Sequence, residues 1–115
     1  MAKFLLTDTA KYSLSIIEFF RIHYNHETTD QAAEFSDDLV ERAKFNIGQN
    51  PAQYGLSILA QTAGLMLQDC YYPLKPYHSL YRVIGKEEGE DVIELVLFYR
   101  DRQDIEQLLY LVQTS

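Results

Sequence analysis

The segment 92–99 limits the possible folds more than any other part of the sequence. It is a nearly continuous apolar run, rich in β-branched residues and interrupted only by Glu94. Such a run is typical of a β-strand that is covered on both faces, because a strand with one face in water alternates apolar and polar residues. We therefore expect a central strand over 92–99, with other elements packed on both sides of it.

The chain length bounds the architecture around this strand. With 115 residues, the chain is expected to form one domain, spanning 1–115, with one hydrophobic core. No apolar run of about 18 residues is present, so no membrane contact is expected and the predicted location is the cytoplasm. Cys70 is the single cysteine, which excludes an intramolecular disulfide and predicts a small buried hydrophobe.

The first half of the chain predicts a strand followed by two helices. Residues 2–7 form the expected strand, and Asp8 is placed to cap the first helix. Thr28, with Gln31 three residues later, has the spacing of a capping box and predicts the start of the second helix. The apolar positions recur at intervals typical of helices: Ala10, Leu14, Ile17, Phe20 and Tyr24, then Ala32, Phe35, Leu39, Ala43 and Ile47.

The end of the second helix is predicted at Gly48, as a left-handed residue, followed by the breaker Asn50-Pro51. The two helices, separated by a short polar break, should form a hairpin. Residues 52–65 stay open, because the apolar stretch within them fits either a buried strand or a helical turn.

The second half of the chain predicts strands. They are expected over 66–72, 77–84 and 92–99, with a proline-containing bend at 73–76 and a charged turn at 85–91. Alternation divides the middle strand into two faces: Tyr77, Ser79, Tyr81 and Val83 on one, His78, Leu80, Arg82 and Ile84 on the other.

The chain is expected to close with a short helix opened by Asp101. Its apolar positions are Ile105, Leu108, Leu109 and Val112. The resulting order is strand, helix, helix, three strands, helix, which predicts an α+β fold. An antiparallel sheet with the helical hairpin packed on one face buries these apolar stripes.

Three segments carry a resemblance to a known family. They are Asp69-Cys70-Tyr71, then Tyr77-His78-Ser79-Leu80-Tyr81-Arg82-Val83, and the arginine-rich 100–109. Together with the element order and length, they resemble the successive signatures of the RelE/ParE superfamily, the toxins of type II toxin-antitoxin systems that include plasmid stabilisation proteins. The resemblance covers nearly the whole chain, although its motifs are short.

The resemblance implies a protein that a cognate antitoxin neutralises and that, once free, attacks one of two targets. ParE-like members inhibit DNA gyrase by contact. RelE-like members cut messenger RNA in the ribosome. A third alternative is a relative that has lost toxicity and persists as an antitoxin-binding module.

The residues favour the ParE-like alternative. RNA cleavage at a 2′-hydroxyl requires cations that stabilise charge developing on the phosphate. RelE-type nucleases resemble one another in the basic residues that they place where this chain has Tyr72, Leu74 and His78, with Lys75 nearby. The formal net charge of −7 also opposes direct nucleic-acid binding. The chain is therefore expected to be a gyrase inhibitor, and an endoribonuclease only if it is RelE-like.

Four residues remain candidates for catalysis in that second case: His78, Arg82, Arg100 and Arg102. Arg82 fits better as a structural partner of Glu94 on the neighbouring strand. Tyr99, Arg100 and Arg102 are the candidates for binding the target or the antitoxin, although Asp101 and Asp104 can neutralise the two arginines locally. No cofactor is expected, and His23 and His26 lack the further ligands of a metal site.

Overall fold

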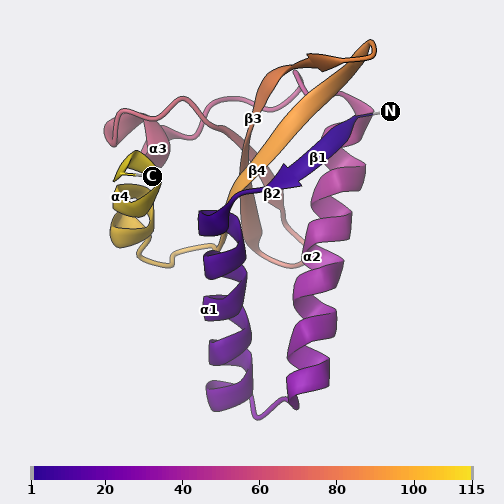
Figure 1. The fold of residues 1–115 in the computed structure, drawn as a ribbon. Helices are drawn as coiled ribbons and strands as arrows, with labels where there is room; N and C mark the ends of the chain where they lie inside the picture. The colour runs from indigo at the N-terminus through magenta and orange to yellow at the C-terminus, as the bar shows by residue number, and fades with distance from the viewer. Residues whose placement is uncertain (1, 115) are drawn as a thin grey trace.

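The computed structural model describes residues 2–114 and has an α+β fold (Figure 1). The elements, in chain order, are β1 (Lys3–Leu6), α1 (Asp8–Tyr24), α2 (Thr29–Gln49), α3 (Ile58–Thr62), β2 (Gln68–Tyr72), β3 (Tyr77–Glu87), β4 (Glu90–Arg100) and α4 (Glu106–Thr114). The four strands form one sheet in the order β1-β4-β3-β2. None of the described helices has the length and apolarity needed to cross a membrane.

The sheet is mixed, and the expectation of a wholly antiparallel sheet is wrong for β1. Strands β2, β3 and β4 pair antiparallel, whereas β1 pairs parallel to β4 with Leu6 opposite Leu95. Tight turns join β2 to β3 and β3 to β4, and such turns force neighbouring strands to run in opposite directions. No turn joins β1 to β4, so their relative direction depends on how α1 and α2 pack.

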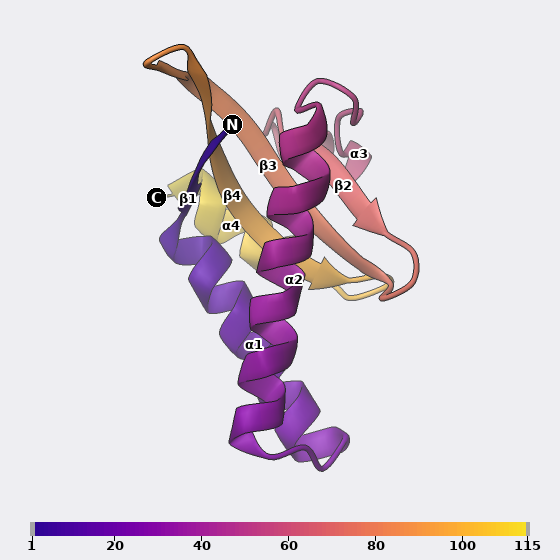
Figure 2. The ribbon, with the colours of Figure 1, turned by 90° about the vertical axis from the view of Figure 1, so that its right-hand side faces the viewer.

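Strand β4 lies inside the sheet and is covered on both faces, as its composition predicts. Ile93 and Leu95 belong to the core cluster under α1 and α2, and Leu97 belongs to the cluster under α3 and α4. All three are fully buried. The prediction of a helical hairpin across one face is confirmed, and Figure 2 shows α1 and α2 lying along that face.

A β-bulge at Val96 places Leu97 on the face of β4 opposite to Leu95, although the two residues are two positions apart. Leu97 lies opposite Leu80 and Leu95 lies opposite Tyr81, which leaves Val96 as the extra residue. The α1 segment supplies partners for the backbone there, since Ser13 Oγ accepts a hydrogen bond of 3.0 Å from the Phe98 amide. The Thr7 hydroxyl, in addition, donates to the Val96 carbonyl at 3.2 Å. The bulge therefore leaves these backbone groups paired.

Two helix starts differ from the prediction by a few residues. Thr7, not Asp8, caps α1, because its extended backbone lets its hydroxyl accept from the amide of Ala10. Helix α4 begins at Glu106 rather than near Asp101. The carboxylate of Asp104 accepts the Glu106 amide at 3.1 Å and so satisfies that free backbone donor.

The capping box at Thr28 and the breaker Asn50-Pro51 are confirmed as the two ends of α2, whereas the predicted left-handed conformation of Gly48 is wrong. Helix α2 continues through Gly48 to Gln49, and Asn50 leaves the helix with an extended backbone. Pro51 accounts for this end, because the residue before a proline is disfavoured in the α conformation. Gly48 stays helical with the Phe4 ring 3.8 Å from the position of a Cβ atom.

The segment 85–91 is mostly strand, and the turn is shorter than expected. Strands β3 and β4 stay paired out to Glu87 and Glu90, and only Glu88 and Gly89 form the turn, both at positive φ as a tight hairpin requires. The charged residues of this segment predict a turn, but most of them lie on a two-stranded ribbon that projects into water (Figure 1).

The segment left open, 52–65, contains an isolated bridge and a short helix. Leu56 pairs with Gln68, and Ser57 caps α3. The following strand, β2, begins at Gln68, two residues later than predicted. Helix α3 lies with α4 over the face of the sheet that α1 and α2 leave free.

Candidate functional site

Three rings from neighbouring strands form a stack near the turn between β2 and β3. The register places Tyr71 of β2 opposite His78 of β3, and His78 opposite Tyr99 of β4. The rings of His78 and Tyr99 are nearly parallel, with centroids 4.5 Å apart, and the Tyr71 ring lies 4.6 Å from His78. Directly opposed side chains on one face of a sheet are in contact, so the strand register creates the stack.

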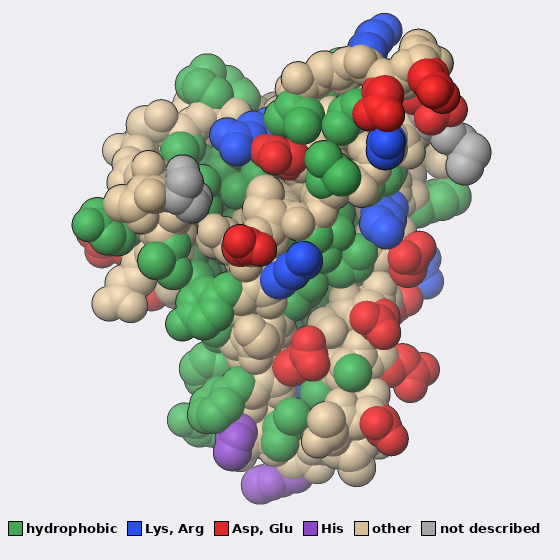
Figure 3. All heavy atoms as spheres, viewed as in Figure 1, with side chains coloured by type: hydrophobic (Ala, Val, Ile, Leu, Met, Phe, Trp, Pro, Cys, Tyr) green, Lys and Arg blue, Asp and Glu red, His purple; other side chains and the backbone are tan. Residues whose placement is uncertain are grey.

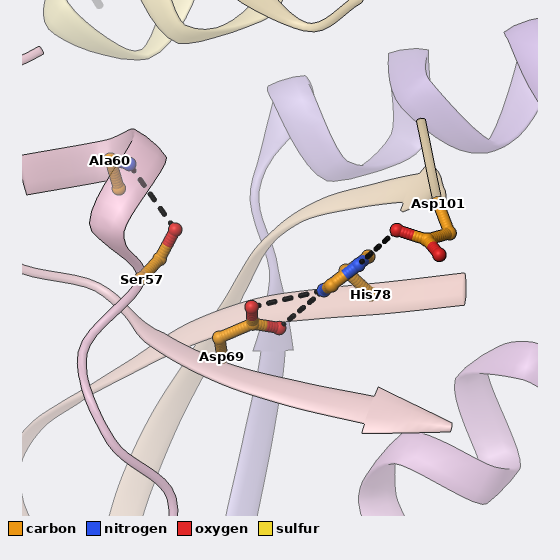
Figure 4. Close-up of polar contacts among 5 residues, drawn as sticks. All are labelled: Ser57, Ala60, Asp69, His78 and Asp101. Atoms are coloured by element: carbon orange, nitrogen blue, oxygen red, sulfur yellow. Dashed lines mark hydrogen bonds and ion pairs between the residues drawn. The ribbon is translucent and has the colours of Figure 1, made fainter. Parts of the chain in front are cut away.

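Two carboxylates flank His78 (Figure 4). Asp69 lies two residues before Tyr71, and Asp101 lies two residues after Tyr99, a spacing that returns a side chain to the same face. The Nδ1 atom of His78 is 2.9 Å from each carboxylate oxygen of Asp69, and Nε2 is 3.3 Å from an oxygen of Asp101. Both ring nitrogens are therefore engaged, Nδ1 the more closely.

The carboxylates change the proton affinity of His78. Burial alone would lower its pKa, because burial disfavours the charged imidazolium. The hydrogen bond and negative charge of Asp69, followed by those of Asp101, outweigh burial and raise the pKa of His78 above its ordinary value. Burial and the same two carboxylates raise the pKa of Tyr99, partly opposed by a hydrogen bond with Ser57. The site thus favours an imidazolium beside a neutral phenol.

This constellation lines a pocket of about 430 Å³, which we call the His78 pocket. Its opposite wall is the start of α3, where the buried Ser57 accepts a hydrogen bond from the Ala60 amide (Figure 4). The charged side chains around the pocket are Asp69, Asp101, Asp104, Arg102 and, when protonated, His78. Carboxylates outnumber cations even with His78 charged, so the local field opposes the approach of a phosphate.

The three candidate binding residues differ in accessibility. Tyr99 is only 3% exposed, so a partner reaches it only through the His78 pocket. Arg100 and Arg102 are exposed, and their guanidinium groups have no ion pair or hydrogen bond among residues 2–114. The neutralisation expected from Asp101 and Asp104 is absent there, because the first binds His78 and the second binds a backbone amide.

Two other cations lie outside the pocket. Arg82 Nε donates to Glu94 Oε1 at 2.7 Å across the β3–β4 ladder, which confirms the structural interpretation of this residue. Lys75 pairs with Asp38 of α2 and lies 4.9 Å from the Phe35 ring centroid. It therefore serves the hairpin side of the sheet and adds no charge to the His78 pocket.

The two remaining histidines lie at the far end of the helical hairpin. His23 packs against the Phe19 ring at 4.1 Å, and His26 lies in the turn between α1 and α2 with a φ of 58°. Within the described part of the chain, no three histidine, cysteine or carboxylate side chains come together in a way that could bind a metal ion.

Sequence reasoning missed the two partners of His78. Asp69 appeared only as part of a motif, and Asp101 was expected to open a helix. The spacing Asp69-x-Tyr71 and Tyr99-x-Asp101 is visible in the sequence, but it points to His78 only once the register of three strands is known.

No family model matches this sequence, and no curated protein matches it either. The geometry and chemistry of the residues therefore carry the functional argument.

We expect the substitution Asp69→Asn to lower the pKa of His78. The amide preserves the shape of the side chain but removes the negative charge and the closest acceptor of the imidazolium. An NMR titration of the imidazole protons measures the shift. Asp104→Asn is the control, because Asp104 lines the pocket without contacting His78. Equal titration curves for the wild type and Asp69→Asn would contradict the expectation.

The same pairing makes the stability of the fold depend on pH. The folded-state pKa of His78 lies above the unfolded value of about 6.5, so the protonated ring stabilises the fold in full below that pH. This contribution is lost as the pH rises through the folded-state pKa. Urea unfolding on either side of this window should show a smaller pH dependence in Asp69→Asn than in the wild type.

Proposed function

We propose that this chain is a ParE-like toxin of a type II toxin-antitoxin pair, with the RelE/ParE fold, that inhibits DNA gyrase by protein contact and is neutralised by a bound antitoxin. The observed order of elements, with a helical hairpin on one face of the sheet and a short C-terminal helix on the other, is compatible with the resemblance. One fold serves many functions, so the choice of activity depends on the site.

The contacts of His78 with Asp69 and Asp101 are the main observation that argues against RNA cleavage. Cleavage requires cations directed at the phosphate and a group that is free to transfer a proton. Here both nitrogens of His78 face carboxylates, and the pocket has an excess of negative charge. Such a pocket gives little stabilisation to a phosphorane-like transition state.

The exposed arginines support recognition of a protein. Arg100 ends β4 and Arg102 lies in the turn after it, and within residues 2–114 their guanidinium groups have no ion-pair or hydrogen-bond partner, in a chain of net charge −7. Arginine is enriched in protein interfaces, where its planar group forms paired hydrogen bonds with carboxylates. These two residues are therefore the proposed contacts to the target or to the antitoxin. Tyr99, which lines the His78 pocket, is the third proposed contact.

The RelE-like alternative has one observation in its favour. His78 lies in a pocket beside Arg102, and its raised pKa increases the fraction that is protonated and able to act as a general acid. In that mechanism, Asp101 would have to move away from Nε2 before the proton could reach a leaving oxygen.

An induction experiment that follows DNA supercoiling and ribosome-dependent messenger cleavage together distinguishes the two activities. For the wild type we expect a loss of supercoiling and no cleavage in the ribosomal A site. The double substitution Arg100→Ala with Arg102→Ala should abolish the supercoiling effect by weakening partner recognition. Lys86→Ala, which removes an exposed cation from the distal β-ribbon, should leave it unchanged.

Cleavage by the wild type that His78→Ala abolishes would overturn the gyrase assignment and give His78 the catalytic role. The absence of both effects, together with binding of an antitoxin encoded beside the gene, would instead support a relative that has lost toxicity.

A further inference from the structure

Helix α1 continues beyond the sheet, and the C-terminal part of its apolar stripe is exposed. Ala10, Leu14 and Ile17 are buried against β4, whereas Phe20 is 51% exposed and Tyr24 is 67% exposed. The sequence predicts all five as one core-facing stripe. They differ because the last turns of α1 and the first turns of α2 extend past the strands, as Figure 1 and Figure 2 show.

The exposed rings form an ordered surface rather than scattered side chains. Phe20 and Tyr24 are stacked with centroids 5.2 Å apart, Phe19 meets Phe20 edge to face at 5.9 Å, and His23 packs on Phe19. With Tyr12 they make up what we call the α1 aromatic face. Rings that are already packed together lose little conformational freedom on binding, and aromatic residues dominate the energetics of interfaces.

The distribution of charge indicates which partner can approach this face. After Asp8, the exposed residues of α1 include no carboxylate, and Glu18 is turned toward α2, where it accepts a hydrogen bond from Ser36. Acidic side chains are instead exposed along α2. Figure 3 shows hydrophobic side chains gathered on the α1 side and acidic ones on the α2 side. Because each copy carries a charge of −7, two copies meet with least repulsion through the α1 side.

We infer that the α1 aromatic face binds a second copy of this chain, with the two α1 helices packed across a twofold axis. A twofold interface brings the same patch of both copies together, so an uncharged aromatic patch is complementary to itself. The four aromatic side chains of Tyr12, Phe19, Phe20 and Tyr24 are half to two-thirds exposed. With the flanking Lys11 and Ser15, they would bury up to roughly 1,000 Å² over both copies. An interface of this size forms a weak dimer, in exchange with the monomer.

Sedimentation equilibrium of the full chain tests this inference. Between about 10 µM and about 1 mM of protein, a range that includes the dissociation constants of weak dimers, the average mass should rise with concentration. It should rise from the monomer value of 13.4 kDa toward twice that value. Phe20→Glu should weaken the dimer by about tenfold or more, because it places a charge in the centre of the interface. The control Phe45→Glu changes a ring on α2 that is more exposed than Phe20, 65% against 51%, and should leave the association unchanged.

A second variant, Tyr24→Glu, keeps the inference testable if Phe20→Glu does not fold. Circular dichroism checks that both variants are folded. Concentration-dependent NMR shifts of the wild type should map to α1. A chain that stays monomeric to about 1 mM would overturn the inference and leave this face to a different protein. So would a dimer that both glutamate variants leave unchanged. The inference is independent of the proposed function.

Discussion

Leu95→Ala is expected to lower the free energy of unfolding by about 2–5 kcal/mol. Leu95 is fully buried in β4 and belongs to the cluster that joins the sheet to α1 and α2. It lies opposite Leu6 on one side and Tyr81 on the other, at the point where β1 ends. Truncation therefore opens a cavity where a strand junction and the helical hairpin meet, and neither can move in to fill it.

Urea unfolding followed by circular dichroism measures this effect. The matched control is Ile84→Ala, which truncates a half-exposed residue at the bulge in β3 and should cost less than about 1 kcal/mol. A loss below about 1 kcal/mol for Leu95→Ala would place this residue outside the core and would contradict the central position of β4.

Leu97→Ala should have a comparable cost, about 2–5 kcal/mol, for a different reason. Leu97 is fully buried on the opposite face, in the cluster with Leu80, Ile105 and Leu108. The cavity therefore opens beneath α4 rather than beneath the hairpin. Hydrogen exchange should report this difference, with protection lost in α4 for Leu97→Ala and in α1 for Leu95→Ala.

The double variant checks that the two faces are separate clusters. Side chains on opposite faces share few neighbours, so the two losses should add to within about 0.5 kcal/mol. A large departure from additivity, or loss of α1 protection in Leu97→Ala alone, would show that the two clusters behave as one core.

Much of the fold follows from local signals in the sequence. The run at 92–99 identified a strand covered on both faces, and the capping box at Thr28 located the start of α2. The pair Arg82–Glu94 was also predictable, because two neighbouring strands bring opposite charges together. Errors were concentrated at element ends, where a neighbour such as Thr7 or Asp104 supplies the capping group.

The candidate site was predictable only in part. His78, Arg100 and Arg102 were identified by residue type and position, whereas Asp69 and Asp101 were not assigned to His78. Their contact depends on a four-residue bend that fixes the register of β2 against β3, and on β4 lying beside β3. The arrangement around His78 is formed by three strands and the turn after β4 together, and no one strand contains it.

The sequence by itself determined most of the segments that become helices and strands, with 52–65 and 85–91 as the exceptions, and it determined which strand is buried on both faces. These properties depend on side-chain periodicity and on backbone groups a few residues apart, so short segments of the sequence are enough to specify them. The tertiary structure alone decided the parallel pairing of β1, the carboxylates on both sides of His78, and the exposure of Phe20 and Tyr24. Each of these depends on where a distant element begins, ends or lies in register, and an apolar stripe is the same in sequence whether or not a sheet extends far enough to cover it.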